Sequence, residues 1–332
     1  MTIHIESLTI ADVSNKLKTG EITAVELASV FLDEIQKKND DVHAYIEVFD
    51  DVLEQAKHAD TLIAEGKGKA LTGIPIAVKD CILMHGRRAT SSSKILEGYK
   101  ATYDATVITA LKEQGVVFVG RTNMDEFAMG GSTETSYYGV TKNPCDPTRV
   151  PGGSSGGSAA SVAMNGALVA LGSDTGGSIR QPAAFCGVVG LKPTYGAVSR
   201  YGLMAMASSL DQIGPITKTV DDAERVFQAI SQYDRMDSTS VPDEVRKSYM
   251  RPEKKTYSLG VPKDFVYAEG VDEDVIAEFK TSLEHLKKLG HTIKEVDLPY
   301  MHHSLAAYYI SCRLKPQLIW QDLMVCGMDF AK

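Results

Sequence analysis

The chain has 332 residues, of which 43% are hydrophobic and 23% are charged, the composition of an ordinary globular protein. Its 35 Lys and Arg residues against 43 Asp and Glu residues give a net charge of −8, which argues against autonomous nucleic-acid binding because that usually needs a basic face. No apolar run approaches the roughly 18 residues of a membrane span, and the N-terminus has no signal-peptide core, so we expect a cytoplasmic protein that does not enter a membrane. The five cysteines are odd in number and no C-x-x-C or H-E-x-x-H motif is present, so neither a disulfide framework nor a metal site is predicted.

Helices are predicted throughout the first 70 residues. Thr9 and Thr23 are suitable N-cap residues, and Gly20 is placed to end the first helix. Residues 24–38 and 51–65 carry apolar side chains at helical spacing, which predicts that each helix packs one face against a core.

From residue 71 onward the pattern changes to strands that alternate with helices. Residues 74–78 form a short apolar strand that ends on Lys79, and a helix over 105–113 leads into a strand over 116–119. The later predicted elements are helices over 155–164, from Ile179, over 221–230 and over 275–289, and strands over 167–171, 257–261 and 291–296. This alternation indicates an α/β fold.

A glycine-rich stretch is the most unusual part of the sequence. More than half of the 28 glycines fall between Gly130 and Gly214, and residues 152–158 have the sequence GGSSGGS. A flexible linker is disfavoured because a helix of small residues follows at once. A phosphate-binding loop is disfavoured because no Lys follows the second glycine and no buried strand precedes the segment. Acyl transfer is the interpretation that remains.

Residues 174–178, Asp-Thr-Gly-Gly-Ser, place Ser178 in a turn between a strand and a helix. We expect its hydroxyl to be exposed there, with backbone N–H groups converging on one point as an oxyanion hole requires. A nucleophilic serine needs a base, and Lys79 is a better candidate than any histidine because burial lowers the pKa of a lysine. Judged from the residues alone, a surface lysine at a strand end remains the alternative.

Several segments together resemble the amidase signature family. They are residues 73–80 (GIPIAVKD), 152–160 (GGSSGGSAA), 172–183 (GSDTGGSIRQPA) and 190–194 (GLKPT). The resemblance implies an α/β amidase signature fold in which helices cover both faces of a mixed central β-sheet. It implies a single domain over residues 1–310, made of N-terminal helices (1–70), a catalytic core (71–215) and a continuation (216–310).

The resemblance also implies a catalytic triad. Ser178 would be the nucleophile, Ser154, preceded by a cis peptide bond, the bridging serine, and Lys79 the base. The oxyanion hole would be formed by the backbone amides of Thr175, Gly176, Gly177 and Ser178. For Ser155 and Ser158 we favour roles as a helix N-cap and a helix-packing residue, and for Asp174 and Arg180 a role in bracing the turn.

Within the family, residues 123–136 and 207–215 are similar to the A subunits of tRNA-dependent amidotransferases. This implies hydrolysis of glutamine, with no cofactor in this chain, and transfer of ammonia to a partner, the B subunit. The B subunit would bind misacylated Glu-tRNA(Gln) or Asp-tRNA(Asn) and use ATP and Mg²⁺, and the C subunit would complete a heterotrimer. Gly130 and Tyr309 would contact glutamine, although Tyr309 fits a core position equally well. The alternatives are a stand-alone amidase for another small amide and an inactive truncated fragment.

Residues 311–332 lack the family pattern, which stops after Ile310 although members of this subfamily are longer. A set of codons can be chosen that encodes Arg313–Ala331. When the same nucleotides are read in a frame that starts two bases later, they encode a peptide that resembles the family's continuation. We therefore expect residues 311–332 to be an out-of-frame tail and the C-terminal part of the sheet to be missing.

Overall fold

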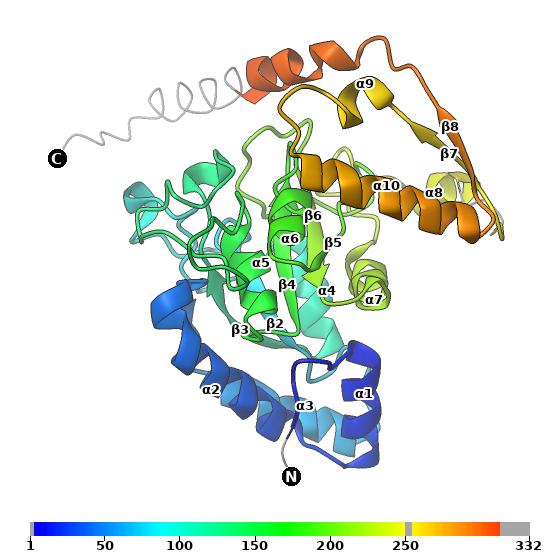
Figure 1. Ribbon diagram of the computed structural model, residues 1–332. Coiled ribbons are helices and arrows are strands. Elements are labelled where there is room, and N and C mark those ends of the chain that lie inside the picture. The colour runs from blue at the N-terminus through cyan, green and yellow to red at the C-terminus, as the bar shows by residue number, and fades with distance from the viewer. Residues whose placement is uncertain (1–2, 250–253, 313–332) are drawn as a thin grey trace. The chain divides into compact units, whose positions relative to one another are not determined.

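The computed structural model describes residues 3–249 and 254–312, which divide into two compact units (Figure 1). The described part of the first unit is residues 3–246, and that of the second is residues 247–249 and 254–312. The predicted out-of-frame tail lies outside the described residues, apart from Ser311 and Cys312. The single domain over 1–310 stays a prediction.

Three helices open the first unit, as predicted. They are α1 (Ile10–Thr19), α2 (Ala24–Val42) and α3 (Val52–Ala64). Thr9 and Thr23 cap α1 and α2 through reciprocal hydrogen bonds with an acidic residue three positions later. Gly20 ends α1 in the left-handed conformation, which glycine adopts without steric cost.

A six-stranded mixed β-sheet forms the centre of this unit. In spatial order its strands are β1 (Tyr45–Val48), β3 (Val117–Thr122), β2 (Pro75–Lys79), β4 (Val169–Asp174), β6 (Gln212–Thr217) and β5 (Val189–Gly190). Strand β2 pairs in parallel with β3 and β4, whereas β1, β6 and β5 make antiparallel pairs. The predicted α/β class with a mixed sheet is confirmed.

Helices cover this sheet, and every residue of β2, β3, β4 and β6 is buried. The covering helices are α4 (Thr106–Gln114), α5 (Gly156–Ala163), α6 (Arg180–Phe185) and α7 (Val220–Ile230). Helix α5 packs against β2, β4 and β6, while α7 packs against β6 and α4 (Figure 1). Because neighbouring strand residues point to opposite faces, a strand that is buried at every position must be covered on both sides.

The small residues of α5 allow the helix to lie very close to the sheet. A Cβ atom at Gly157 would overlap the backbone of Asn123, and Ala159 and Ala160 belong to a buried cluster with Ala77 and Ala170. This close approach brings the loop that precedes α5 to the carboxyl ends of β2 and β4.

Three details differ from the sequence-based expectation. Strand β1 lies within the first 70 residues, which were expected to be helical, because it pairs with β3. Strand β4 continues to Asp174, beyond the predicted end at Leu171, because Gly172–Asp174 pair with the antiparallel strand β6. Strand β6 was not predicted, because Gly214 and Pro215 lie inside it and both residues are rare in strand interiors.

The second unit contains the predicted strand–helix–strand. Strand β7 (Ser258–Val261) pairs in parallel with β8 (Thr292–Glu295), and α10 (Glu273–Lys288) lies between them in the chain. Over the part of the chain that the structure describes, the remaining short elements are η1 (Lys94–Leu96), η2 (Glu126–Ala128), α8 (Asp243–Tyr249), α9 (Lys263–Val266) and η3 (Met301–His303). Within the described residues, no helix combines the length and the apolar character that crossing a membrane would take.

Candidate active site

Lys79 is the last residue of β2 and is fully buried between β3 and β4. Its Nζ lies 2.7 Å from Ser154 Oγ, 2.9 Å from Ser173 Oγ and 3.4 Å from the Ser173 carbonyl oxygen. Burial lowers the pKa of Lys79, because a charged ammonium loses its hydration there. The side chain is therefore not a surface lysine, and it contacts one of the serines of the glycine-rich motif.

Ser154 lies in the loop that leads into α5, and the peptide bond between Gly153 and Ser154 is cis. Its side chain is fully buried, and its carbonyl oxygen accepts a hydrogen bond from the Asp125 amide at 3.2 Å. Gln181 holds the loop on the other side, since its Oε1 accepts from the Gly153 amide at 2.8 Å. Contacts on both sides thus fix the position of the Ser154 hydroxyl.

Ser178 ends the turn that follows β4, and its carbonyl oxygen accepts from the Ser155 amide at 3.2 Å. The loop of Ser154 and the turn of Ser178 therefore lie against each other. Ser178 is only 7% exposed, so the expectation of an exposed hydroxyl was wrong. Packing against the loop before α5 accounts for this burial.

Asp174 braces the turn, as the sequence indicated. Its carboxylate accepts from the Gly177 and Ile179 amides at 2.8 and 3.1 Å and pairs with the Arg180 guanidinium at 2.9 Å. Burial would raise the pKa of Asp174, but the hydrogen bonds from Arg180 and from these amides outweigh it and hold the pKa below its ordinary value.

One of the four amides expected to form the oxyanion hole is already engaged, because the Gly177 N–H donates to Asp174. For the amides of Thr175, Gly176 and Ser178 we find no acceptor among the described residues. These three N–H groups have no competing partner there, and their role in an oxyanion hole stays a prediction.

The two other serines of the motif make structural contacts. Ser155 is the N-cap residue of α5, as expected, but its side chain makes no capping hydrogen bond. Its hydroxyl instead bonds to the Ser173 backbone at 3.1 and 3.3 Å. Ser158 bonds to Thr122 Oγ1 at 2.7 Å and to the Leu171 carbonyl oxygen at 3.0 Å, which attaches α5 to the sheet. Both contacts hold the helix against the ends of the strands.

The two residues expected to contact substrate lie in different units. Gly130 follows η2 in the first unit, where a Cβ would overlap the Asp125 side chain. Tyr309 lies in the second unit, is 54% exposed and packs edge-on against Tyr308. The role of each residue in binding substrate stays a prediction.

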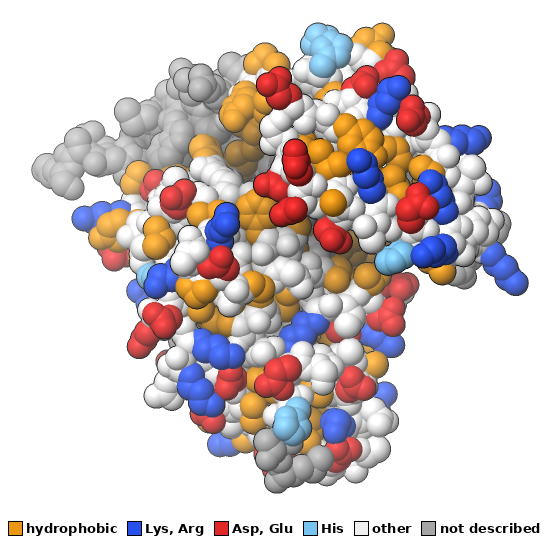
Figure 2. Space-filling model, in the orientation of Figure 1, with side chains coloured by type: hydrophobic (Ala, Val, Ile, Leu, Met, Phe, Trp, Pro, Cys, Tyr) orange, Lys and Arg blue, Asp and Glu red, His pale blue; other side chains and the backbone are white. Residues whose placement is uncertain are grey.

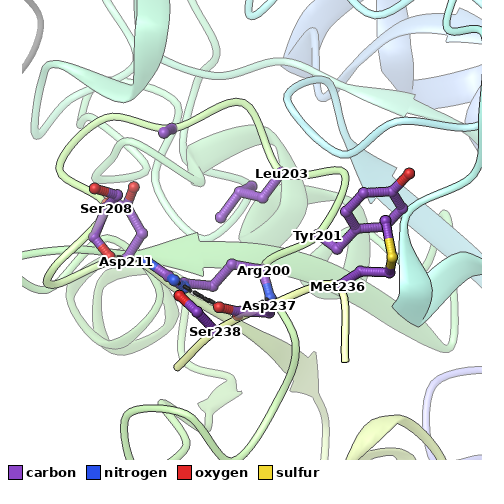
Figure 3. Close-up of a pocket in the computed structure, with 9 residues that line it drawn as sticks. Arg200, Tyr201, Leu203, Ser208, Asp211, Met236, Asp237 and Ser238 are labelled. Atoms are coloured by element: carbon purple, nitrogen blue, oxygen red, sulfur yellow. Dashed lines mark hydrogen bonds and ion pairs between the residues drawn. The ribbon is translucent and has the colours of Figure 1, made fainter. Parts of the chain in front are cut away.

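Asp211 lines a cavity of about 240 Å³ together with Arg200, Ser208 and Asp237 (Figure 3). Arg200 and Asp237 form an ion pair in its wall, at 2.6 Å, and Ser208 and Asp211 lie next to each other (Figure 3). Asp211 connects the cavity to the turn, because its Oδ1 accepts from Thr175 Oγ1 at 2.6 Å.

Sequence reasoning missed Ser173 and Asp211. Ser173 is a polar residue at the end of an otherwise apolar strand, which was the available signal. Asp211 is distant in sequence from the turn and approaches it only because β6 pairs with β4. Among the described residues, no three His, Cys, Asp or Glu side chains are grouped as metal ligands.

The chain is similar to known amidases over most of its length. It matches the Amidase family model over residues 26–317. It is 48% identical over 311 residues to the A subunit of glutamyl-tRNA(Gln) amidotransferase of Syntrophus aciditrophicus, covering 93% of this chain and 64% of that protein. It is 50% identical over 309 residues to the protein of the same name from Carboxydothermus hydrogenoformans, covering 91% of this chain and 63% of that protein. The chain thus spans slightly less than two thirds of the length of these relatives.

Solved structures agree with this match. The crystal structure of the A subunit of glutamyl-tRNA(Gln) amidotransferase from Thermotoga maritima has a TM-score of 0.80 at 39% identity, over 98% of this chain and 71% of that chain. Native peptide amidase from Stenotrophomonas maltophilia has a TM-score of 0.80 at 29% identity, over 91% of this chain and 64% of that chain.

Proposed function

The chain belongs to the amidase family, and from this premise we propose that it is the glutamine-hydrolysing subunit of a tRNA-dependent amidotransferase. The observation that carries the proposal is the buried contact of 2.7 Å between Lys79 Nζ and Ser154 Oγ, next to the turn that bears Ser178. The choice of glutamine as substrate is supported by relatives that are about half identical to this chain and are named as the A subunits of glutamyl-tRNA(Gln) amidotransferases.

Catalysis begins with Lys79 in its neutral form, which its burial favours. The amine of Lys79 takes the proton of Ser154, and Ser154 takes the proton of Ser178. The oxygen of Ser178 then forms a bond to the carboxamide carbon of glutamine, and the negative charge that develops on the carbonyl oxygen is stabilised by the Gly176 and Ser178 amides.

The attack of Ser178 produces a tetrahedral intermediate at the carboxamide carbon. When this intermediate collapses, the carbon–nitrogen bond of the carboxamide breaks. The proton held by the lysine returns through Ser154 to the departing nitrogen, so that ammonia leaves and a glutamyl ester remains on Ser178. Water, activated by the same base, hydrolyses this ester and releases glutamate. Lys79 thus acts as a base in the first half and as an acid when ammonia leaves.

The ammonia is used by partner subunits. The B subunit binds the misacylated tRNA, Glu-tRNA(Gln) or Asp-tRNA(Asn), and activates its carboxylate with ATP and Mg²⁺, while the C subunit completes a heterotrimer. This chain requires no cofactor of its own for the hydrolytic step.

The test is a transfer assay with glutamine labelled with ¹⁵N in its carboxamide. The chain is purified with the B and C subunits of the same genome, and the label is followed into Glu-tRNA(Gln). We expect labelled Gln-tRNA(Gln) that depends on the chain, on ATP and on Ser178, with the Ser178→Ala variant as the control. Hydrolysis of varied small amides by the isolated chain, without transfer to tRNA, would instead identify a stand-alone amidase, and absence of any hydrolysis would identify an inactive chain.

A further inference from the structure

Asp211 is a buried carboxylate outside the proposed triad that contacts the turn of Ser178. It is 2% exposed, and its Oδ1 accepts from Thr175 Oγ1 at 2.6 Å. Its carboxylate also accepts from the Met206 and Ala207 amides at 2.9 and 3.1 Å. The next residue, Gln212, pairs with Asp174 in the sheet. Asp211 is therefore held both by the hydrogen bonds of its side chain and by the pairing of the strand that follows it.

The turn needs such an anchor because its centre is two glycines. Gly177 has a φ of 125°, a region that only glycine adopts readily, and a glycine pair has the greatest backbone freedom of any dipeptide. On the Ser178 side, Asp174 restrains the turn through the Gly177 and Ile179 amides. On the strand side, the hydrogen bond between Thr175 and Asp211 is the corresponding restraint.

The contacts of Asp211 indicate a role in orientation rather than in charge pairing. Its carboxylate is satisfied by one hydroxyl and two amides. The nearby guanidinium of Arg200 is directed to Asp237 instead (Figure 3). Hydrogen bonds to an ionised group are short and strong, so Asp211 is well suited to fix the side chain of Thr175.

We propose that Asp211 is a positioning residue for the oxyanion site: by holding the Thr175 hydroxyl, it fixes the peptide unit between Thr175 and Gly176, whose N–H faces the developing oxyanion. The inference rests on the proposed function, since it assumes that Ser178 is the nucleophile. A preorganised donor contributes to the transition state without costly rearrangement, so loosening the turn slows the chemical step and leaves substrate binding nearly unchanged.

The primary variant is Thr175→Val, which removes the hydroxyl at nearly constant volume, and its matched control is Thr175→Ser, which keeps the hydroxyl. Asp211→Asn places an amide NH₂ or a weaker acceptor against the same partners and completes a double-mutant cycle. Three quantities are measured in the full chain with its partner subunits: kcat for glutamine, KM for glutamine, and the rate at which a fluorophosphonate probe labels Ser178. Melting temperatures establish that each variant is folded.

We expect Thr175→Val and Asp211→Asn each to lower kcat and the labelling rate by about 10–100-fold, less than the loss of a whole oxyanion donor, with KM changed less than about twofold. Thr175→Ser should restore most of the rate, and the double variant should be no slower than the slower single variant. A folded Thr175→Val protein with the wild-type rate, or losses that multiply in the double variant, would overturn the inference.

The labelling assay separates this inference from the proposed function. Labelling of wild-type Ser178 without glutamine hydrolysis would refute glutamine as substrate while leaving the test of Asp211 intact. A wild-type chain that neither reacts with the probe nor hydrolyses glutamine would overturn the proposed nucleophile, and the role of Asp211 with it.

Discussion

At the scale of single residues, the free-energy cost of burying Lys79 is linked to its proposed use as a base. A fully buried lysine in contact with two serine hydroxyls has a pKa below its ordinary value because its ammonium form is poorly solvated. The same shift makes two quantities depend on pH: the rate of hydrolysis and the free energy of unfolding.

The rate should increase with pH as Lys79 loses its proton. Because burial lowers the pKa of Lys79, the midpoint should lie below the roughly 10.4 of a free lysine. Lys79→Met should lower kcat by several orders of magnitude at every pH, since no neutral amine is left. The pH profile of glutamine hydrolysis by wild type and variant checks this, and a wild-type midpoint at or above the ordinary lysine value would contradict it.

The same residue should make stability depend on pH with a defined sign. Between the lowered folded pKa and the ordinary unfolded value, the unfolded chain binds more protons at Lys79 than the folded chain, so its contribution to the free energy of unfolding increases with pH. The stability of wild type relative to Lys79→Met should therefore rise with pH, from the lowered pKa of the folded state up to the ordinary lysine value of about 10.4. Chemical denaturation of both proteins measures this, with Lys57→Met, at an exposed lysine of α3, as the control. A relative stability that stays constant or falls would show that burying the lysine has no cost.

The sequence identified the candidate catalytic residues that lie in recognisable motifs. It did not identify residues whose contacts with the site depend on how the strands pair. Lys79, Ser154 and Ser178 belong to motifs, and the structure brings the first two into direct contact. Asp211 lies in the segment 207–215 that resembles the A subunits, but no role was assigned to it, because its contact with Thr175 depends on the register of β4 against β6.

At the scale of elements, the position of α5 determines where Ser154 lies. The helix can approach the sheet only because its first residues have no side chain, and a Cβ at Gly157 would overlap backbone atoms of Asn123 and Ala44. The run of small residues predicted the helix correctly to within one residue at each end. The distance between helix and sheet is a tertiary property, so periodicity alone could not predict it.

Gly157→Ala should accordingly destabilise the protein and displace the Ser154 loop. Overpacking in a tight core costs typically about 1–3 kcal/mol, and here the overlapped atoms are backbone, which yields little. Gly98→Ala is the matched control, because a Cβ at Gly98 meets nothing within 4 Å. Urea denaturation and glutamine hydrolysis should both separate the two variants; equal stability of the two would mean that α5 moves without cost.

Strand β6 is an element that local sequence propensity argues against and that tertiary packing nevertheless forms. Gly214 and Pro215 argue against a strand, yet a Cβ at Gly214 would overlap the Leu191 carbonyl oxygen, so the close approach of neighbouring chain requires glycine there. Packing against β4 and β5 overrides the local propensity. The strand could be predicted only by knowing its neighbours.

At the scale of the whole molecule, the proposed chemistry lies entirely in the first unit. Lys79, Ser154, Ser178 and Asp211 belong to that unit, whereas Tyr309, the expected contact to glutamine, belongs to the second. The second unit's strand–helix–strand was predicted from its periodicity. The division near Arg246 was not predicted, because no long linker or change of composition marks it in the sequence.

The charge of the whole chain makes a prediction about tRNA. Affinity for tRNA comes largely from contacts of Lys and Arg side chains to phosphates. This chain has a net charge of −8. On the face shown in Figure 2, Lys and Arg are interspersed with Asp and Glu. We therefore expect the isolated chain to bind Glu-tRNA(Gln) with a Kd weaker than about 10 µM at about 0.15 M salt, within the range of non-specific binding. Fluorescence anisotropy with labelled tRNA measures this, and addition of the B and C subunits should tighten binding by at least about tenfold. Tight binding by the chain alone, persisting as salt is raised, would mean that it contributes a specific tRNA surface and that recognition is not left to its partners.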